Sequence, residues 1–296
     1  MNSQQLPKKV AILAGWGRYP IVLAEALKAK GCQVYGLAIH GHADKALHEI
    51  CDECRSVSPA RIRPMLKFLK NHGVQEATMA GKIFKTRLFQ RSVWLKNFPD
   101  LIFLKYFYSH FFSRQRVNNN DDRLLTVVVN MFADYGVRFA PATDFVPEIL
   151  VQQGTLTKRT LSVGQQQDIV FGWNLAREMG RLDIGQSVAV KNQAVLAVEA
   201  VEGTDECIRR AGTLCRSGGF SVVKVAKPHQ DMRFDVPTIG VGTIQTMHQA
   251  GGKVLVVEAN RTIILDEAQV IKTADKLGIC IVASTHEQMS SANSAA

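Results

Sequence analysis

A strand, a helix and a second strand follow one another near the start of the chain, and this order constrains the fold more than any other feature. Residues 10–14 are apolar and lead into a glycine turn. Residues 20–29 have the composition of a helix, with Pro20 at its start and Gly31 just past its end. Residues 33–39 are apolar again, completing a βαβ unit. We therefore predict an α/β protein whose N-terminal domain is Rossmann-like.

The turn of this unit contains Gly15 and Gly17, followed by Arg18. Glycines at this place allow the backbone to approach a phosphate, and the helix N-terminus adds its dipole. The dinucleotide fingerprint is incomplete, because Pro20 replaces its third glycine and no acidic residue ends the second strand. We therefore predict a nucleotide phosphate site without NAD, with a plain strand-to-helix turn as the alternative.

A further strand predicted at residues 77–80 runs directly into Gly81 and Lys82. The carboxyl ends of parallel strands share one edge of a sheet, so Lys82 should lie near Gly15. Lys82 is a candidate phosphate contact, and an ordinary exposed lysine is the alternative.

The chain of 296 residues is long enough for two domains. Residues 140–167 lack a sustained period, so we place the boundary there, with domains at 1–150 and 151–286 and a disordered tail at 287–296. The second half predicts a mixed α/β domain. Its expected strands are 187–190, 195–201, 221–225, 254–258, 262–265 and 279–282, and its expected helices are 168–179, 206–214 and 267–277.

Basic residues are concentrated in the first half of the chain. Residues 1–150 hold 21 Lys and Arg against 12 Asp and Glu, whereas residues 151–296 hold 15 against 14. No apolar run reaches the ~20 residues that a membrane span needs, and the N-terminus does not resemble a secretion signal. We expect a cytoplasmic protein with reduced cysteines, in which the C-x-x-C of Cys51 and Cys54 is structural.

Residues 82–123 combine positive charge with aromatic side chains. They hold nine basic residues against three acidic ones and ten of the chain's 22 aromatic residues. This composition suits a membrane interface or the acyl chains of an anionic lipid. A single-stranded nucleic acid or a helical hairpin that packs its aromatic rings into a core would also account for it.

A charged loop at residues 224–243 follows an apolar strand. Its polar residues are Lys224, Lys227, Gln230, Asp231, Arg233 and Asp235. Asp oxygens suit Mg²⁺, and Lys and Arg suit phosphate. The loop therefore predicts chemistry on a phosphate ester, and a solvated loop with cancelling charges is the alternative.

Further carboxylates stand at predicted strand and turn ends, among them Asp183, Glu199, Glu202 and Asp205. One carboxylate could bind a metal while another accepts a proton from water, although each alone is more often an ion pair or a cap. Thr204 or Asp205 is expected to cap the helix at 206–214. The chain has no P-loop, G-x-S-x-G or H-x-x-x-H motif.

The motifs together resemble one family. They are AILAGWGRYP, MAGK, DIGQSVAV, AVEAVEGTDECIRRAG and KVAKPHQDMRFDVPTIGVGT, and the similarity runs from about residue 9 to residue 283. They resemble the LpxI-type UDP-2,3-diacylglucosamine pyrophosphatases of lipid A synthesis. In this chain Trp16 stands between the two glycines, where the family usually has a small polar residue.

The resemblance implies Mg²⁺-assisted hydrolysis of UDP-2,3-diacylglucosamine to UMP and 2,3-diacylglucosamine 1-phosphate, or lipid X. It implies a UDP-binding N-terminal domain, a catalytic C-terminal domain, a homodimer, and action at the cytoplasmic face of the inner membrane. An Asp of the Q-D-x-R-x-D run is regarded as essential, so Asp231 and Asp235 are both expected to be catalytic and to bind metal. The other residues expected to be catalytic are Lys224, Lys227, Gln230, Arg233, Glu202 and Asp205. Substrate contacts are expected from Gly15, Gly17, Arg18, Lys82, Gln186, Gly203, Thr204 and Thr238.

Two other classes remain. A non-catalytic nucleotide or lipid sensor would use the same cations but release no UMP. A nucleic-acid binder would use residues 82–123 and lose affinity steeply with salt. Because the densest polar motifs lie in the nearly neutral second half, we rank the sensor second and expect no nucleic-acid partner.

Overall fold

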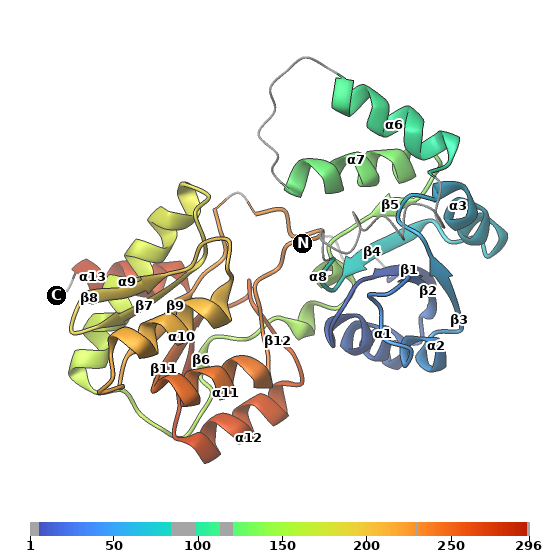
Figure 1. The fold of residues 1–296 in the computed structure, drawn as a ribbon. Coiled ribbons are helices and arrows are strands. Elements are labelled where there is room, and N and C mark those ends of the chain that lie inside the picture. The colour runs from blue at the N-terminus through green and yellow to red at the C-terminus, as the bar shows by residue number, and fades with distance from the viewer. Residues whose placement is uncertain (1–5, 84–98, 113–120, 229, 295–296) are drawn as a thin grey trace. The chain divides into compact units, whose positions relative to one another are not determined.

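The chain forms two α/β units, each with its own sheet and core (Figure 1). The computed structural model describes residues 6–83, 99–112, 121–228 and 230–294. The first unit comprises Met1–Pro147 together with the short segment Asp231–Phe234, and the second comprises Glu148–Gln230 and Asp235–Ala296. The two-domain α/β organisation predicted from the sequence is confirmed.

The first unit is built on a five-stranded parallel sheet. Its strands are β1 (Lys9–Ala14), β2 (Gln33–Ile39), β3 (Glu53–Val57), β4 (Glu76–Ala80) and β5 (Arg138–Phe139), in the order β3-β2-β1-β4-β5. All four pairings are parallel, so the predicted βαβ opening is confirmed. The order is that of a Rossmann-type sheet, in which ligands bind beyond the carboxyl ends of the strands.

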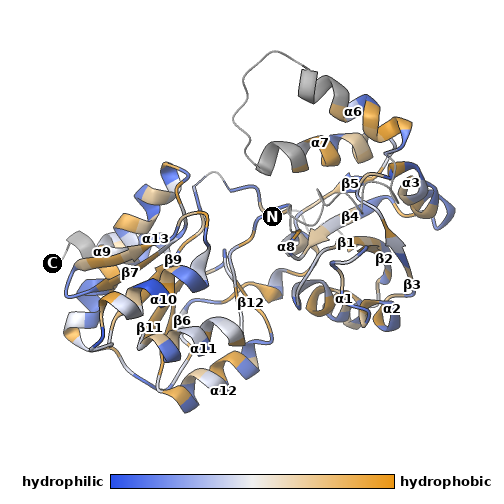
Figure 2. Ribbon diagram, in the orientation of Figure 1, coloured by the Kyte–Doolittle hydropathy of each residue, from blue (hydrophilic) through white to orange (hydrophobic). Residues whose placement is uncertain are grey.

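Helices connect and cover these strands. They are α1 (Tyr19–Ala29), α2 (Leu47–Ile50), α3 (Ile62–Asn71), α6 (Leu101–Phe112), α7 (Asp121–Ala133) and α8 (Ala142–Phe145). Apolar side chains on the inner faces of α3 and α7 pack with β1, β2 and β4 around Leu37, Leu69 and Phe132. Figure 2 shows apolar colouring along the strands and mixed colouring on the helices, as expected when only one helix face is buried.

The second unit contains a six-stranded mixed sheet in the order β6-β13-β11-β9-β7-β8. The strands are β6 (Gly154–Thr155), β7 (Ser187–Lys191), β8 (Ala194–Val198), β9 (Ser221–Lys224), β11 (Val254–Glu258) and β13 (Cys280–Ser284). β10 (Thr238–Ile239) and β12 (Ile263–Ile264) form a separate parallel pair. The predicted β7–β8 hairpin is present, and Asn192 and Gln193 have the positive φ values that a tight hairpin turn requires.

The helices of the second unit are α9 (Val163–Arg181), α10 (Thr204–Leu214), α11 (Val241–Ala250), α12 (Glu267–Leu277) and α13 (His286–Ser294), with a 3-10 turn at Pro147–Ile149. α9 begins five residues before the predicted start at residue 168, because Ser162 and Gln165 form a reciprocal capping box. α13 occupies most of the segment for which the sequence predicts disorder.

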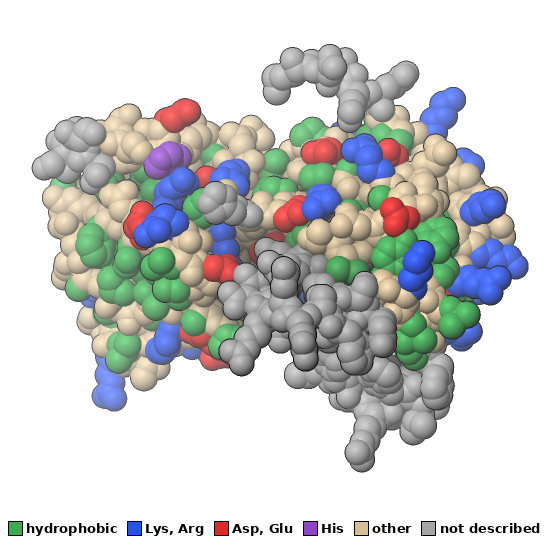
Figure 3. All heavy atoms as spheres, turned by 90° about the horizontal axis from the view of Figure 1, so that it is seen from above, with side chains coloured by type: hydrophobic (Ala, Val, Ile, Leu, Met, Phe, Trp, Pro, Cys, Tyr) green, Lys and Arg blue, Asp and Glu red, His purple; other side chains and the backbone are tan. Residues whose placement is uncertain are grey.

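The aromatic and basic stretch at residues 82–123 is described only in part. In α6, Phe103 and Phe107 stack with ring centroids 4.1 Å apart, and Phe107 is buried. Leu101 and Leu104 on the same helix are exposed. Residues 84–98 and 113–120 of the predicted lipid-facing segment lie outside the described residues. On the visible part of the face in Figure 3, Lys and Arg side chains of the first unit are dispersed instead of forming one patch.

Among the described helices, none combines the length and the apolar character needed to cross a bilayer.

Candidate functional site

The loops that follow β1 and β4 touch backbone to backbone. The amide of Gly15 donates to the carbonyl of Ala80 over 2.8 Å, and Trp16 and Lys82 exchange two backbone hydrogen bonds of 2.8 Å each. A Cβ at Gly15 would lie 2.6 Å from the Lys82 carbonyl oxygen, and one at Gly81 would lie 2.8 Å from that of Trp16. Gly15 therefore serves loop packing, and its amide is already used within the protein.

The remaining predicted contacts of the first unit lie around this loop pair. Gly17 has φ +109°, a conformation that favours glycine, and a Cβ there would meet nothing within 4 Å. Arg18 precedes α1 and forms an exposed ion pair with Glu25. The side chain of Lys82 is exposed. Lys82 thus lies at the same edge as Gly15, as predicted.

In the second unit, four strand ends meet at one edge of the sheet. β9, β11 and β13 are mutually parallel, and β8 runs in the same direction because it is antiparallel to β7, which is antiparallel to β9. Glu199 follows β8, Lys224 ends β9 and Glu258 ends β11. This edge gathers buried charge, since these three residues are 7%, 5% and 4% exposed.

Thr204 joins two of these buried charges. Its hydroxyl donates to Glu199 Oε1 over 3.1 Å and accepts from Lys224 Nζ over 2.8 Å. The hydroxyl oxygen of Ser187 lies 3.3 Å from the hydroxyl oxygen of Thr204. The predicted helix cap is therefore wrong: Gly203 precedes α10 with φ +86°, no side chain caps the helix, and Thr204 is its first residue. The Thr204 hydroxyl turns toward the sheet edge because two charged partners are there.

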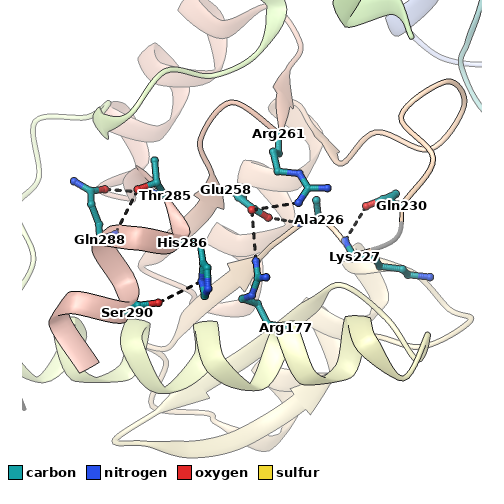
Figure 4. A network of polar contacts seen from close by, with 10 residues as sticks. All are labelled: Arg177, Ala226, Lys227, Gln230, Glu258, Arg261, Thr285, His286, Gln288 and Ser290. Atoms are coloured by element: carbon teal, nitrogen blue, oxygen red, sulfur yellow. Dashed lines mark hydrogen bonds and ion pairs between the residues drawn. The ribbon is translucent and has the colours of Figure 1, made fainter. Parts of the chain in front are cut away.

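Glu258 is the centre of a second group (Figure 4). Its Oε2 accepts the backbone amide of Ala226 over 2.8 Å. Its Oε1 lies 3.7 Å from a guanidinium nitrogen of Arg177 on α9 and 3.8 Å from one of Arg261 in the turn after β11. A backbone amide, an arginine of α9 and an arginine of the turn after β11 thus all lie beside the same buried carboxylate.

The charged loop begins beside this group. The Lys227 amide donates to Gln230 Oε1 over 2.9 Å, and Lys227 Nζ pairs with Asp183 at 2.6 Å. Gln230 is 9% exposed, and its Nε2 has no acceptor among the described residues. His229, which precedes Gln230 in the loop, lies outside the described residues.

Asp231 and Arg233 belong to the first unit and form a bidentate pair. Arg233 Nε lies 2.9 Å from Oδ1 and 3.0 Å from Oδ2, and Nη2 lies 2.5 Å from Oδ2. The hydrogen bonds from Arg233 lower the pKa of Asp231, and those to Asp231 raise the pKa of Arg233. Both carboxylate oxygens of Asp231 are thus engaged by the guanidinium. Phe234 follows and packs against the core of the first unit.

Asp235 belongs to the second unit and is partly exposed. Its carboxylate has the oxygen chemistry that Mg²⁺ prefers, whereas Asp231 would first have to release Arg233. No group of three or more His, Cys, Asp or Glu that could hold a metal occurs among the described residues.

The other predicted residues are dispersed over the second unit. Glu202 pairs with Arg210 of α10 at 2.7 Å, and Asp205 is exposed in the first turn of that helix. Thr238 donates to the Val236 carbonyl over 2.9 Å. The Gln186 side-chain oxygen is buried without a donor among the described residues.

Sequence reasoning did not single out Glu258, Arg177 and Arg261, which the structure brings together. Glu258 ends a strand whose preceding four residues are apolar, which marks a carboxyl edge. Its position at a strand end is the sequence feature that could have identified it. No comparable feature marks Arg177, because an arginine inside a long helix is usually solvated.

Comparison with known proteins covers nearly the whole chain. Residues 9–149 match the LpxI N-terminal domain, and residues 152–282 match the LpxI C-terminal domain. A protein of Caulobacter vibrioides named UDP-2,3-diacylglucosamine pyrophosphatase LpxI is 32% identical over 286 residues, covering 93% of this chain and 97% of that protein.

A solved structure of the biotin carboxylase domain dimer of Hydrogenobacter thermophilus 2-oxoglutarate carboxylase has 11% sequence identity. It covers 74% of this chain and 34% of that chain, with a TM-score of 0.26. This likeness is too low to inform the fold or the function.

Proposed function

Because this chain belongs to the LpxI family, we propose that it hydrolyses the diphosphate bond of UDP-2,3-diacylglucosamine, giving UMP and 2,3-diacylglucosamine 1-phosphate in lipid A synthesis. The observation that carries this proposal is the match to a pyrophosphatase of that name over 97% of its length. Both domains are matched, so the proposal concerns the whole enzyme.

The charges of the charged loop, which begins at the end of β9, support work on a diphosphate. Hydrolysis adds water across the bridging P–O bond, so one phosphorus gains the water oxygen and the bridging oxygen leaves with the other phosphate. The protein must neutralise the charge on both phosphates and orient the water. We assign neutralisation to Lys224, Lys227 and Arg233. Lys224 suits this role because it is buried and is held by the Thr204 hydroxyl.

We assign the water and the metal to the carboxylates of the charged loop. Asp235 would hold Mg²⁺ together with phosphate oxygens, and the ion would supply charge neutralisation on the diphosphate. Asp231 would serve through Arg233, whose guanidinium it orients by bidentate hydrogen bonds. Gly17, Arg18 and Lys82 of the first unit would contact the uridine part.

Association with the inner membrane surface and assembly into a homodimer belong to the same proposal. The exposed Leu101 and Leu104 of α6 support a contact with a lipid surface.

The decisive experiment is incubation of the purified protein with UDP-2,3-diacylglucosamine and Mg²⁺, followed by analysis for UMP. Asp231→Ala and Asp235→Ala, made separately, should each lower kcat by roughly 10²-fold or more while leaving substrate binding largely intact. Asp144→Ala is the control, because Asp144 is an exposed carboxylate on α8. Normal rates in both loop variants would refute the role of the loop.

A non-catalytic nucleotide or lipid sensor is the alternative. It would bind the substrate at every Mg²⁺ concentration and release no UMP, so the same assay separates the two functions.

A further inference from the structure

The two arginines beside Glu258, and Gln230 in the adjoining loop, have hydrogen-bond donors with no acceptor in the part of the chain that the structure describes. Arg177 and Arg261 lie 3.7 and 3.8 Å from Glu258 Oε1, beyond the roughly 2.7–2.9 Å of a charge-assisted hydrogen bond. Neither guanidinium donates a hydrogen bond to a residue that the structure describes. The buried Nε2 of Gln230, in the adjoining loop, has no acceptor in the same part of the chain.

Glu258 explains why the two guanidinium groups are near each other. Its Oε2 is fixed by the Ala226 amide, which leaves Oε1 to attract Arg177 from α9 and Arg261 from the turn after β11. In Figure 4 the two side chains approach this oxygen from different elements. Two cations against one carboxylate leave one positive charge, and the arginine side chains are 24% and 33% exposed. An anion can therefore reach them where screening by water is reduced.

We propose that Arg177 and Arg261 bind a phosphoryl group of the substrate's diphosphate, and that Glu258 is the positioning residue that holds them together. The inference rests on the proposed function for the identity of the substrate. Guanidinium groups present planar N–H forks that match phosphate oxygens. Gln230 Nε2, a buried donor in the adjoining loop, is a further candidate to donate to the same anion.

Binding of two monophosphates tests the proposal without turnover. UMP presents the phosphoryl group of the nucleoside side, and glucosamine 1-phosphate presents that of the sugar side. Calorimetry at fixed ionic strength should show that Arg177→Ala and Arg261→Ala each weaken one of these ligands by roughly tenfold to a hundredfold. The ligand that loses affinity identifies which phosphoryl group is bound.

Arg181→Ala is the matched control. Arg181 lies one turn after Arg177 on α9, its loss removes the same charge, and it is 61% exposed in an ion pair with Glu178. It should bind both ligands as the unaltered protein does. If Arg177→Ala and Arg261→Ala behave like Arg181→Ala, the proposal is overturned.

Glu258→Gln separates positioning from charge. Glutamine retains an acceptor for the Ala226 amide but removes the negative charge, so simple electrostatics would tighten anion binding. We expect weaker binding and a higher KM, because the two arginines lose their anchor. Tighter binding would overturn the role of Glu258.

Arg177→Lys and Arg261→Lys cover the case in which the alanine variants do not fold. They keep the charge and lose the planar fork, so weaker monophosphate binding is again expected and unchanged binding would contradict the proposal.

The UMP-release assay tests the proposed reaction separately from this inference. An unaltered protein that binds monophosphates through these arginines yet releases no UMP would refute the proposed reaction alone, and a fully active Arg177→Ala, Arg261→Ala double variant would refute this inference alone.

Discussion

Single glycines decide how closely the loops of the first unit approach each other. Gly15 and Gly81 leave no room for a Cβ, and Gly81 also has φ +90°. Gly17, two residues from Gly15, has φ +109° but open space around it. The effect of a steric clash can therefore be measured separately from the effect of a positive φ by comparing Gly81 with Gly17.

Gly81→Ala should destabilise the first unit by roughly 2–4 kcal/mol, because the new Cβ both clashes with Trp16 and requires an unfavourable φ. Gly17→Ala has only the conformational cost, so it should lower the free energy of unfolding by about 1–2 kcal/mol. Thermal melting measures the difference, with a shift of roughly 2–4 °C per kcal/mol for a unit of this size. Equal losses in the two variants would contradict the steric account.

Asp231 should contribute pH-dependent stability. Its pKa is lowered in the folded protein by the hydrogen bonds from Arg233, so folding favours the ionised form. The contribution is fully present above the unfolded pKa of about 3.9 and is lost as pH falls through the lower folded pKa. The stability difference between the unaltered protein and Asp231→Asn should therefore be constant from about pH 7 to 5 and shrink below about pH 4. Urea unfolding across this range checks it, and a difference that does not change with pH would be incompatible with the pairing.

At the scale of elements, regular periodicity was enough to predict most strands and helices. α1 and α12 were predicted within a residue or two, because each has apolar positions at helical spacing and a glycine soon after its end. The start of α9 was missed although Ser162 and Gln165 carry the capping-box pattern, since Gly164 and the glutamines at positions 165–167 interrupt the apolar spacing of the helix.

The site was less predictable than the fold. The charged loop was recognised from its composition, but the direction of the Thr204 hydroxyl depends on Glu199 and Lys224, which only the sheet brings together. The pairing of Glu258 with Arg177 links residues about eighty positions apart, and no local pattern reports such a contact.

Ser162→Ala should destabilise α9 and the sheet beneath it by about 1 kcal/mol, because the Gln165 amide loses its acceptor. Gln166→Ala is the control, since Gln166 is an exposed neighbour in the same turn. Chemical denaturation of the two variants gives the comparison. A loss in Gln166→Ala as large as in Ser162→Ala would show that the box is not the cause.

On the scale of the whole molecule, the first unit is completed by a segment from far along the chain. Asp231–Phe234 belongs to it, although the residues on both sides belong to the second unit. Phe234 packs against the core that contains Leu37 and Phe132, and Arg233 lies over its ring at 5.6 Å.

Phe234→Ala should therefore weaken the first unit by about 1–3 kcal/mol, less than the loss for a fully buried phenylalanine. Hydrogen exchange should increase in peptides from β1 and β4 and stay unchanged in peptides from β9 and β11. Phe234→Leu keeps an apolar side chain and should show a smaller effect. Faster exchange confined to the second unit would contradict the assignment of this segment.

This arrangement orders the events of biosynthesis. A ribosome releases the five strands of the first sheet early, but residue 234 leaves the exit tunnel only after β6 through β9 of the second unit have been made. During synthesis, part of the core of the first unit stays uncovered until the segment Asp231–Phe234, more than eighty residues after Pro147, has been made. Premature termination anywhere in between would leave a protein whose apparently finished N-terminal half lacks its last component.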